Sequence, residues 1–277
     1  MNHHFLTAYR HRTLLAVVAL LLHSSATGAC ELPFEIPNAV LEKKVLILGE
    51  LHGTKEAPHF AGEIACSMAT GEGVVVLALE IPAQEQQRID TFLGSEGLPF
   101  DRAALLQGEF WVRPVNRQDG RSSEAKFQLL ERVRKMRRAG GAVSVVAIDD
   151  MRRGMSRDST MAYHVREIVR LNAQARIIAL VGNVHALKGR GAFFDKDYES
   201  LAYLLSDLGP LTLNILHQRG AAWVCINECG PRTMTSEAWV ASTQPGTYIG
   251  EGPDAVPRYH GTVVLQRATV SMPAIAQ

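Results

Sequence analysis

Short apolar runs alternate with amphipathic stretches along most of this chain. The apolar runs are nearly continuous in Val, Ile, Leu and Ala, which is typical of strands covered on both faces. They predict strands over residues 44–48, 74–79, 143–148, 177–181 and 211–217, and two more over 222–226 and 262–266. Helical spacing predicts helices over residues 57–69, 83–93, 122–139, 156–173 and 199–208. This alternation predicts an α/β fold with a mainly parallel central sheet flanked by helices.

The same polar motif follows two of the predicted strands. One strand runs into Gly-Glu-Leu-His, which ends at His52, and another runs into Gly-Asn-Val-His, which ends at His185. Residues two apart lie on the same side of a continuing strand, so Glu50 is expected to pair with His52, and Asn183 with His185.

Two further strands end in acidic residues, Glu80 and the pair Asp149-Asp150. Ligands of open parallel sheets bind outside the carboxyl ends of the strands, so these side chains and the two histidines are expected to line one cleft. Taken singly, such a carboxylate could instead cap the next helix. The recurrence of polar residues at four strand ends favours a functional site.

Clustered carboxylates have displaced pKa values, which suits acid–base catalysis or a divalent cation. The candidate catalytic residues are Glu50, His52, Glu80 and His185. The same four residues are the candidate metal ligands, and histidine with carboxylate suits Mn, Co, Fe or Zn. In the resulting mechanism, Glu50 or Glu80 acts as general base on a water or holds the ion, and the histidines bind the ion or stabilise the developing oxyanion.

Five more residues are candidates for contacting a substrate, namely Arg157, Asp158, Asp149, Arg121 and Trp111. Asp158 lies on the apolar stripe of its helix and in the first turn, where the helix dipole favours a carboxylate. Arg157 could hold a substrate anion, or it could pair with Asp158 or Asp149. Trp111 and Arg121 fall in a long polar loop that could cover the site, the alternative being an ordinary surface turn.

The first 29 residues predict a signal peptide. Arg10 and Arg12 precede an apolar run over residues 13–22, and small residues lead to Ala29. The run is about half of the ~20 residues that a bilayer needs, so we expect no membrane span in the mature chain. A single domain is expected over residues 30–277, in a periplasmic or secreted protein. A lipid-modified Cys30 at the cleavage point is the alternative.

Four cysteines survive cleavage, and an even count in an exported protein predicts disulfides with three possible connectivities. The 277 residues carry 29 Lys+Arg and 28 Asp+Glu. Cleavage removes two arginines and no acid, which leaves 27 basic and 28 acidic residues and a net charge near −1. This balance argues against nucleic acid as a partner, so a small-molecule or peptide substrate is expected.

The motifs resemble a superfamily that groups erythromycin esterases, the Tiki and TraB proteins, and ChaN-like haem-binding uptake proteins. The matching segments are Gly-Glu-Leu-His-Gly-Thr at 49–54, Glu80 before Pro82, Arg-Asp-Ser-Thr-Met-Ala at 157–162 and Gly-Asn-Val-His at 182–185. The resemblance implies an α/β fold with two related halves around one cleft.

The branches of this superfamily imply different functions. Erythromycin esterases imply ester hydrolysis by a Glu/His constellation, and Tiki proteins imply a metal-dependent peptidase. We therefore expect an exported hydrolase of an ester or peptide bond. The alternative is a ChaN-like haem- or iron-binding uptake protein without catalysis, for which His52, His185 and Tyr259 are the candidate haem ligands.

Overall fold

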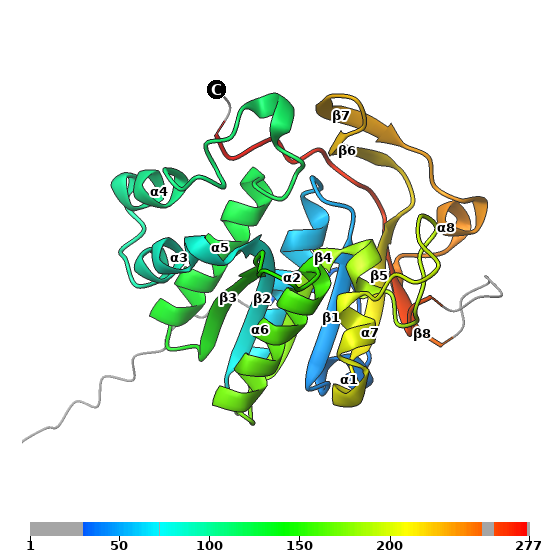
Figure 1. Cartoon of the computed structure of the whole chain (residues 1–277), viewed down its shortest axis with the longest axis horizontal. Helices are drawn as coiled ribbons and strands as arrows, with labels where there is room; N and C mark the ends of the chain where they lie inside the picture. The colour runs from blue at the N-terminus through cyan, green and yellow to red at the C-terminus, as the bar shows by residue number, and fades with distance from the viewer. Residues whose placement is uncertain (1–29, 72, 251–257, 276–277) are drawn as a thin grey trace, which may run out of the picture.

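A computed structural model of the chain describes residues 30–71, 73–250 and 258–275 (Figure 1). The predicted signal peptide, residues 1–29, lies outside this part of the chain. Among the residues described, no helix is both long and apolar enough to cross a bilayer.

The centre of the molecule is a seven-stranded sheet with the strand order β3-β2-β4-β1-β5-β9-β8. In that order the strands are β3 (Val143–Asp149), β2 (Val75–Pro82), β4 (Arg176–Gly182), β1 (Val45–Glu50), β5 (Leu211–His217), β9 (Gly261–Leu265) and β8 (Gly246–Ile249). Every neighbouring pair is parallel except β8 and β9. This confirms the predicted mainly parallel α/β sheet.

Helices cover both faces of the sheet, because alternate residues of each strand point to opposite sides. Leu46 and Leu48 pack on one face, and Val45 and Ile47 pack on the other. The first face is covered by α1 (Asn38–Leu41), α2 (Glu56–Ala69), α3 (Gln86–Leu93), α4 (Pro99–Leu106) and α5 (Glu124–Arg138). The second face is covered by α6 (Arg157–Leu171) and α7 (Leu201–Leu204) (Figure 1).

The carboxyl ends of β1 and β4, which carry the repeated motif, lie side by side. The two strands pair in register so that Glu50 is opposite Gly182. The polar residues that follow them are therefore held at one edge of the sheet, as the strand-end pattern predicted.

The C-terminal third departs most from the predicted elements. The predicted strand at 222–226 is β6 (Gly220–Cys225), which leaves the central sheet and forms an antiparallel hairpin with β7 (Cys229–Met234). The predicted helix at 199–208 shortens to α7 and a 3-10 turn, Ser206–Leu208. The pattern missed α1, α4, β7, β8 and α8 (Ala238–Ser242).

Candidate functional site

His52 lies between two buried carboxylates just beyond the end of β1. Its Nδ1 is 3.0 Å from Glu50 Oε1, and its Nε2 is 3.3 Å from Glu80 Oε2. The His52 side chain is 18% exposed, whereas both glutamates are buried. Burial by itself would lower the pKa of His52, but Glu80 and Glu50 together raise it to about 9. His52 is therefore an imidazolium at neutral pH and donates to both carboxylates.

Glu80, in β2, lies at the centre of the hydrogen bonds and ion pairs of the group. Its Oε1 accepts from Arg157 Nη2 at 2.6 Å, and its Oε2 accepts from the backbone N–H of Gly182 at 2.7 Å. Burial would raise the pKa of Glu80, but the positive charge of its neighbours, His52 first, holds it well below its usual range. A Cβ on Gly182 would lie 3.1 Å from His52 Nε2, so the absent side chain permits this close approach.

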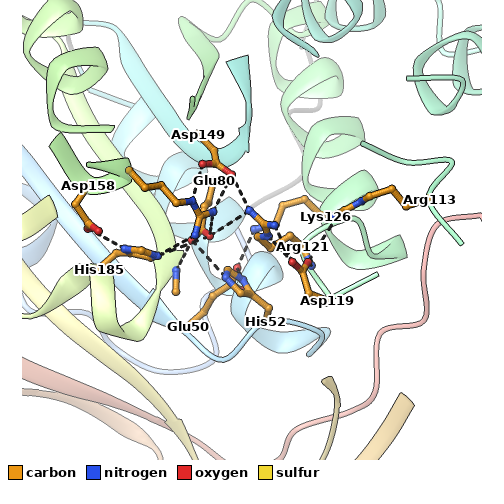
Figure 2. Close-up of polar contacts among 12 residues, drawn as sticks. Glu50, His52, Glu80, Arg113, Asp119, Arg121, Lys126, Asp149, Asp158 and His185 are labelled. Atoms are coloured by element: carbon orange, nitrogen blue, oxygen red, sulfur yellow. Dashed lines mark hydrogen bonds and ion pairs between the residues drawn. The ribbon is translucent and has the colours of Figure 1, made fainter. Parts of the chain in front are cut away.

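Asp149, at the end of β3, bridges two arginines (Figure 2). Arg157 Nε donates to its Oδ1 at 2.7 Å, and Arg121 Nη1 donates to its Oδ2 at 2.6 Å. Arg121 also binds Asp119 through Nη2 at 2.7 Å. Both guanidinium groups are thus already engaged by protein carboxylates. The pairing of Arg157 with Asp149 is the alternative that the sequence offered, and contact of either arginine with a substrate stays a prediction.

Lys126, on α5, is a member of the group that the sequence reasoning missed. It is 1% exposed, and its Nζ donates to Glu50 Oε1 at 2.9 Å. Burial would raise the pKa of Glu50, but the Lys126 ammonium outweighs that effect and lowers it. A signal was present, because Lys126, Leu130 and Val133 follow the helical spacing of the apolar stripe of α5.

His185 is held differently from His52. It lies in a 3-10 turn, Asn183–Ala186, directly after β4. Its Nδ1 is 2.8 Å from Asp158 Oδ1, and its Nε2 is 3.3 Å from Arg157 Nη1. When Nδ1 donates to the Asp158 carboxylate, Nε2 is left with the lone pair that accepts from Arg157. His185 Nε2 also faces Glu80 Oε1 at 3.9 Å (Figure 2).

Asp158 is occupied by protein groups, and its predicted contact with a substrate stays a prediction. The carboxylate is buried in the first turn of α6. Its oxygens accept from His185, from the backbone N–H of Leu201 at 2.7 Å and from the Tyr198 hydroxyl at 2.8 Å. Asp158 therefore orients His185.

Trp111 lies in the core, whereas the polar loop pattern had placed it where it could cover the site. It is fully buried in the apolar core on the α2 and α5 face, against the ring of Phe110 at 4.9 Å. The polar loop folds inward here because buried Glu85 accepts a hydrogen bond from the backbone N–H of Phe110 at 3.1 Å.

Asn183 does not pair with His185, because the strand stops at Gly182 and the chain enters the 3-10 turn.

The donor chemistry of the group does not fit a resident divalent cation. Lys126 already neutralises Glu50, and Arg121 and Arg157 neutralise Glu80, so the carboxylates that would ligate the ion are engaged. Within the described part of the chain, no group of three or more His, Cys, Asp and Glu side chains is arranged to hold a metal ion. A metal ligand set of Glu50, His52, Glu80 and His185 stays a prediction from the sequence.

Haem ligation also stays a prediction. His52 and His185 have both ring nitrogens engaged, and Tyr259 donates its hydroxyl to the carbonyl of Asn183 at 3.0 Å. An axial ligand would have to give up one of these bonds. The surroundings are charged, whereas haem needs an apolar pocket.

Comparison with known proteins identifies the fold. No family model and no curated protein sequence matches the chain. Among solved structures, a histidine-to-asparagine mutant of the erythromycin esterase EreC in its open conformation superimposes with a TM-score of 0.64, at 12% identity over 88% of this chain and 95% of that one. The fold is erythromycin esterase-like.

Two further structures share this fold. A Bacillus cereus protein gives a TM-score of 0.56 at 13% identity, over 86% of this chain and 92% of its own. A succinoglycan biosynthesis protein gives a TM-score of 0.57 at 7% identity, over 85% of this chain and 91% of its own. The resemblance read from the motifs is thus confirmed at the level of the fold. The roles of individual residues rest on the geometry described above.

Proposed function

We propose that the protein is a hydrolase that cleaves an ester bond by acid–base catalysis with two histidines. The observation that carries the proposal is the position of His52 and His185 around Glu80. Their Nε2 atoms face different oxygens of this one carboxylate, at 3.3 Å and 3.9 Å. The erythromycin esterase-like fold supports ester over peptide as the bond that is cleaved.

His185 is the general base of this mechanism and His52 the general acid. His185 Nε2 gives up its hydrogen bond from Arg157 Nη1 and takes a proton from water, whose oxygen bonds to the carbonyl carbon of the ester. The His52 imidazolium gives its proton to the alcohol oxygen as the carbon–oxygen bond breaks, which leaves a carboxylic acid and an alcohol. The proton gained by His185 balances the one lost by His52, and Glu80 stabilises whichever imidazole is charged.

Glu50 and Glu80 are weaker candidates for the base, a role that the strand-end pattern assigned to one of them. Both are buried, and cationic neighbours lower the pKa of each. A carboxylate that binds protons so weakly is a poor proton acceptor. Their place in the mechanism is to orient His52 and keep it protonated.

The test is hydrolysis of a panel of p-nitrophenyl esters and short peptides by wild type, His52→Ala and His185→Asn. We expect ester cleavage by wild type and a fall in kcat of roughly 100-fold or more in each variant, the size typical of a lost acid or base. His59→Asn is the control, because His59 is an exposed residue of α2. Equal rates in wild type and both site variants would refute the proposal.

We also propose that the chain works in the periplasm or outside the cell. It holds two disulfides, Cys30–Cys66 and Cys225–Cys229, and such bonds persist in oxidising compartments. A Cys30 sulfur bonded to Cys66 has no thiol to accept a lipid. The intact mass of exported protein is expected to match residues 30–277 with four oxidised cysteines. A mass raised by a diacylglyceryl group would contradict this.

A further inference from the structure

Two adjacent phenylalanines project from the loop between β4 and α7. Phe193 is 82% exposed and Phe194 is 56% exposed. Their rings meet edge to face with centroids 5.0 Å apart. A pair of large aromatic side chains left together in solvent is a mark of a ligand-binding surface, whereas single exposed apolar residues are ordinary.

The backbone of the loop holds this pair outward. Ala192 and Asp195 exchange two backbone hydrogen bonds, of 2.7 and 3.2 Å, which close a tight turn with the two phenylalanines at its tip. Gly191 begins the turn with φ +95° and donates its N–H to the Tyr198 carbonyl at 2.7 Å. The exposure of the rings thus follows from a hydrogen-bonded turn.

Tyr198 connects the exposed pair to the candidate base. The Phe194 ring packs against the Tyr198 ring at 5.1 Å. The Tyr198 hydroxyl donates to Asp158 Oδ2 at 2.8 Å and lies 3.0 Å from His185 Nδ1. Burial and the Asp158 charge raise the pKa of Tyr198, so the hydroxyl keeps its proton as a donor. A line of aromatic rings therefore runs from solvent to the Asp158–His185 pair.

The charges of the loop do not favour an ionic ligand. Residues 188–199 carry three basic side chains and three acidic ones, so they cancel. An anionic membrane surface or a charged substrate would instead be met by an excess of one sign. The feature left for recognition is apolar contact.

We propose that Phe193 and Phe194 bind an apolar acyl chain or ring of the substrate, whose ester bond is attacked by the water that His185 activates. The inference rests on the proposed hydrolase function and narrows it to esters with a substantial apolar part. Each methylene buried against the rings contributes about 0.8 kcal/mol, which is roughly a fourfold gain in binding at full burial.

The experiment compares kcat/KM for p-nitrophenyl acetate, butyrate and octanoate. We expect kcat/KM of wild type to rise about tenfold or more from the acetate ester to the octanoate ester. In the double variant Phe193→Ser/Phe194→Ser, we expect kcat/KM for the acetate ester to stay as in wild type and the increase with chain length to disappear. Phe100→Ser is the matched control, because Phe100 is 67% exposed on α4 and no ring contact among the described residues joins it to His185.

A binding measurement separates this inference from the proposed function. Calorimetry with octanoate and acetate uses the His185→Asn protein and requires no turnover. Tighter binding of octanoate that vanishes in the double variant supports the inference even where no ester is cleaved. Equal binding of both acids, or an octanoate gain that survives in the double variant, overturns it. Loss of sedimentation with phosphatidylcholine vesicles in the double variant, without a chain-length effect, would assign the pair to a membrane surface instead and also overturn it.

Discussion

The two histidines of the repeated motif lie in different electrostatic environments. His52 is flanked by Glu50 and Glu80 and stays protonated at neutral pH. His185 has one carboxylate at Nδ1 and the Arg157 guanidinium at Nε2, which leaves a lone pair at Nε2. In the proposed mechanism, one sequence pattern thus yields an acid and a base, because each histidine takes its role from its neighbours.

This difference predicts a pH dependence. The folded pKa of His52 is raised to about 9, so its acid form prevails below that pH and is lost as the pH rises through it. We expect kcat/KM for an ester to fall above about pH 9. Replacing Glu50 by Gln removes one carboxylate that favours the imidazolium, so the falling limb should move to lower pH. A pH–rate profile measures this, with NMR titration of His52 as a second readout.

Glu96→Gln is the control for that shift, since Glu96 is exposed and pairs with Arg138 on the surface. Because Glu50→Gln leaves Lys126 buried without its ion-pair partner, folding is checked by circular dichroism before the rates are compared. A falling limb at the same pH in wild type and Glu50→Gln would show that His52 is not the acid.

At the scale of elements, the β6–β7 hairpin supports the turn that carries His52. The carbonyl of Gly53 accepts from the backbone N–H of Trp223 at 3.0 Å and from that of Ser271 at 2.8 Å. Trp223 Nε1 donates to the carbonyl of Gln118 at 2.7 Å, which ties the hairpin to the loop of Arg121. Segments far apart in sequence therefore fix the two loops beside Glu80.

Gly53→Ala is the variant that tests this support. Gly53 has φ +79°, and a Cβ there would lie 2.1 Å from the Trp223 carbonyl oxygen. Gly154 has φ +80° with nothing within 4 Å of its Cβ position, so Gly154→Ala carries the same backbone strain without the clash. We expect Gly53→Ala to lower the free energy of unfolding by about 2 kcal/mol more than Gly154→Ala, the size of an overpacking penalty. Urea titration measures both, and equal losses would contradict a role for the hairpin.

The sequence was sufficient for the elements whose pattern is local. β1 to β5 appear as continuous apolar runs because helices cover both faces of the sheet. Within the β6–β7 hairpin, β7 was not predictable, since it reads Cys-Gly-Pro-Arg-Thr-Met and is largely exposed, with no apolar alternation. The position of the hairpin depends on backbone contacts of β6 with Gly53 and Ala268, which no local pattern records.

The candidate site likewise contains residues that the local sequence pattern predicts and residues whose position only tertiary contacts determine. Glu50, His52, Glu80 and His185 could be found because strand ends of a parallel sheet meet at one edge. Tyr198 could not, because it lies in a loop whose path is set by tertiary contacts with Asp158. Trp111 was misplaced because a polar loop pattern does not distinguish an aromatic residue facing solvent from one folded into the core.

At the scale of the whole molecule, the two disulfides restrain very different lengths of chain. Cys30–Cys66 spans 36 positions and fastens the N-terminal segment to α2. Cys225–Cys229 spans 4 positions and closes the tip of the β6–β7 hairpin. A cross-link stabilises mainly by restricting the unfolded chain, and the effect grows with the length of the closed loop.

The two bonds should therefore be separable by experiment. The chain-entropy relation predicts a loss of about 4 kcal/mol for Cys30→Ser/Cys66→Ser and about 2 kcal/mol for Cys225→Ser/Cys229→Ser. In protein that remains folded, we expect Cys225→Ser/Cys229→Ser to lose more activity than Cys30→Ser/Cys66→Ser. The reason is that the hairpin contacts the His52 turn, whereas Cys66 lies in α2 beside Arg132 and Glu63. Thermal unfolding and ester hydrolysis on both double variants measure the two effects. An activity loss confined to the Cys30/Cys66 variant would contradict the link between the hairpin and the site.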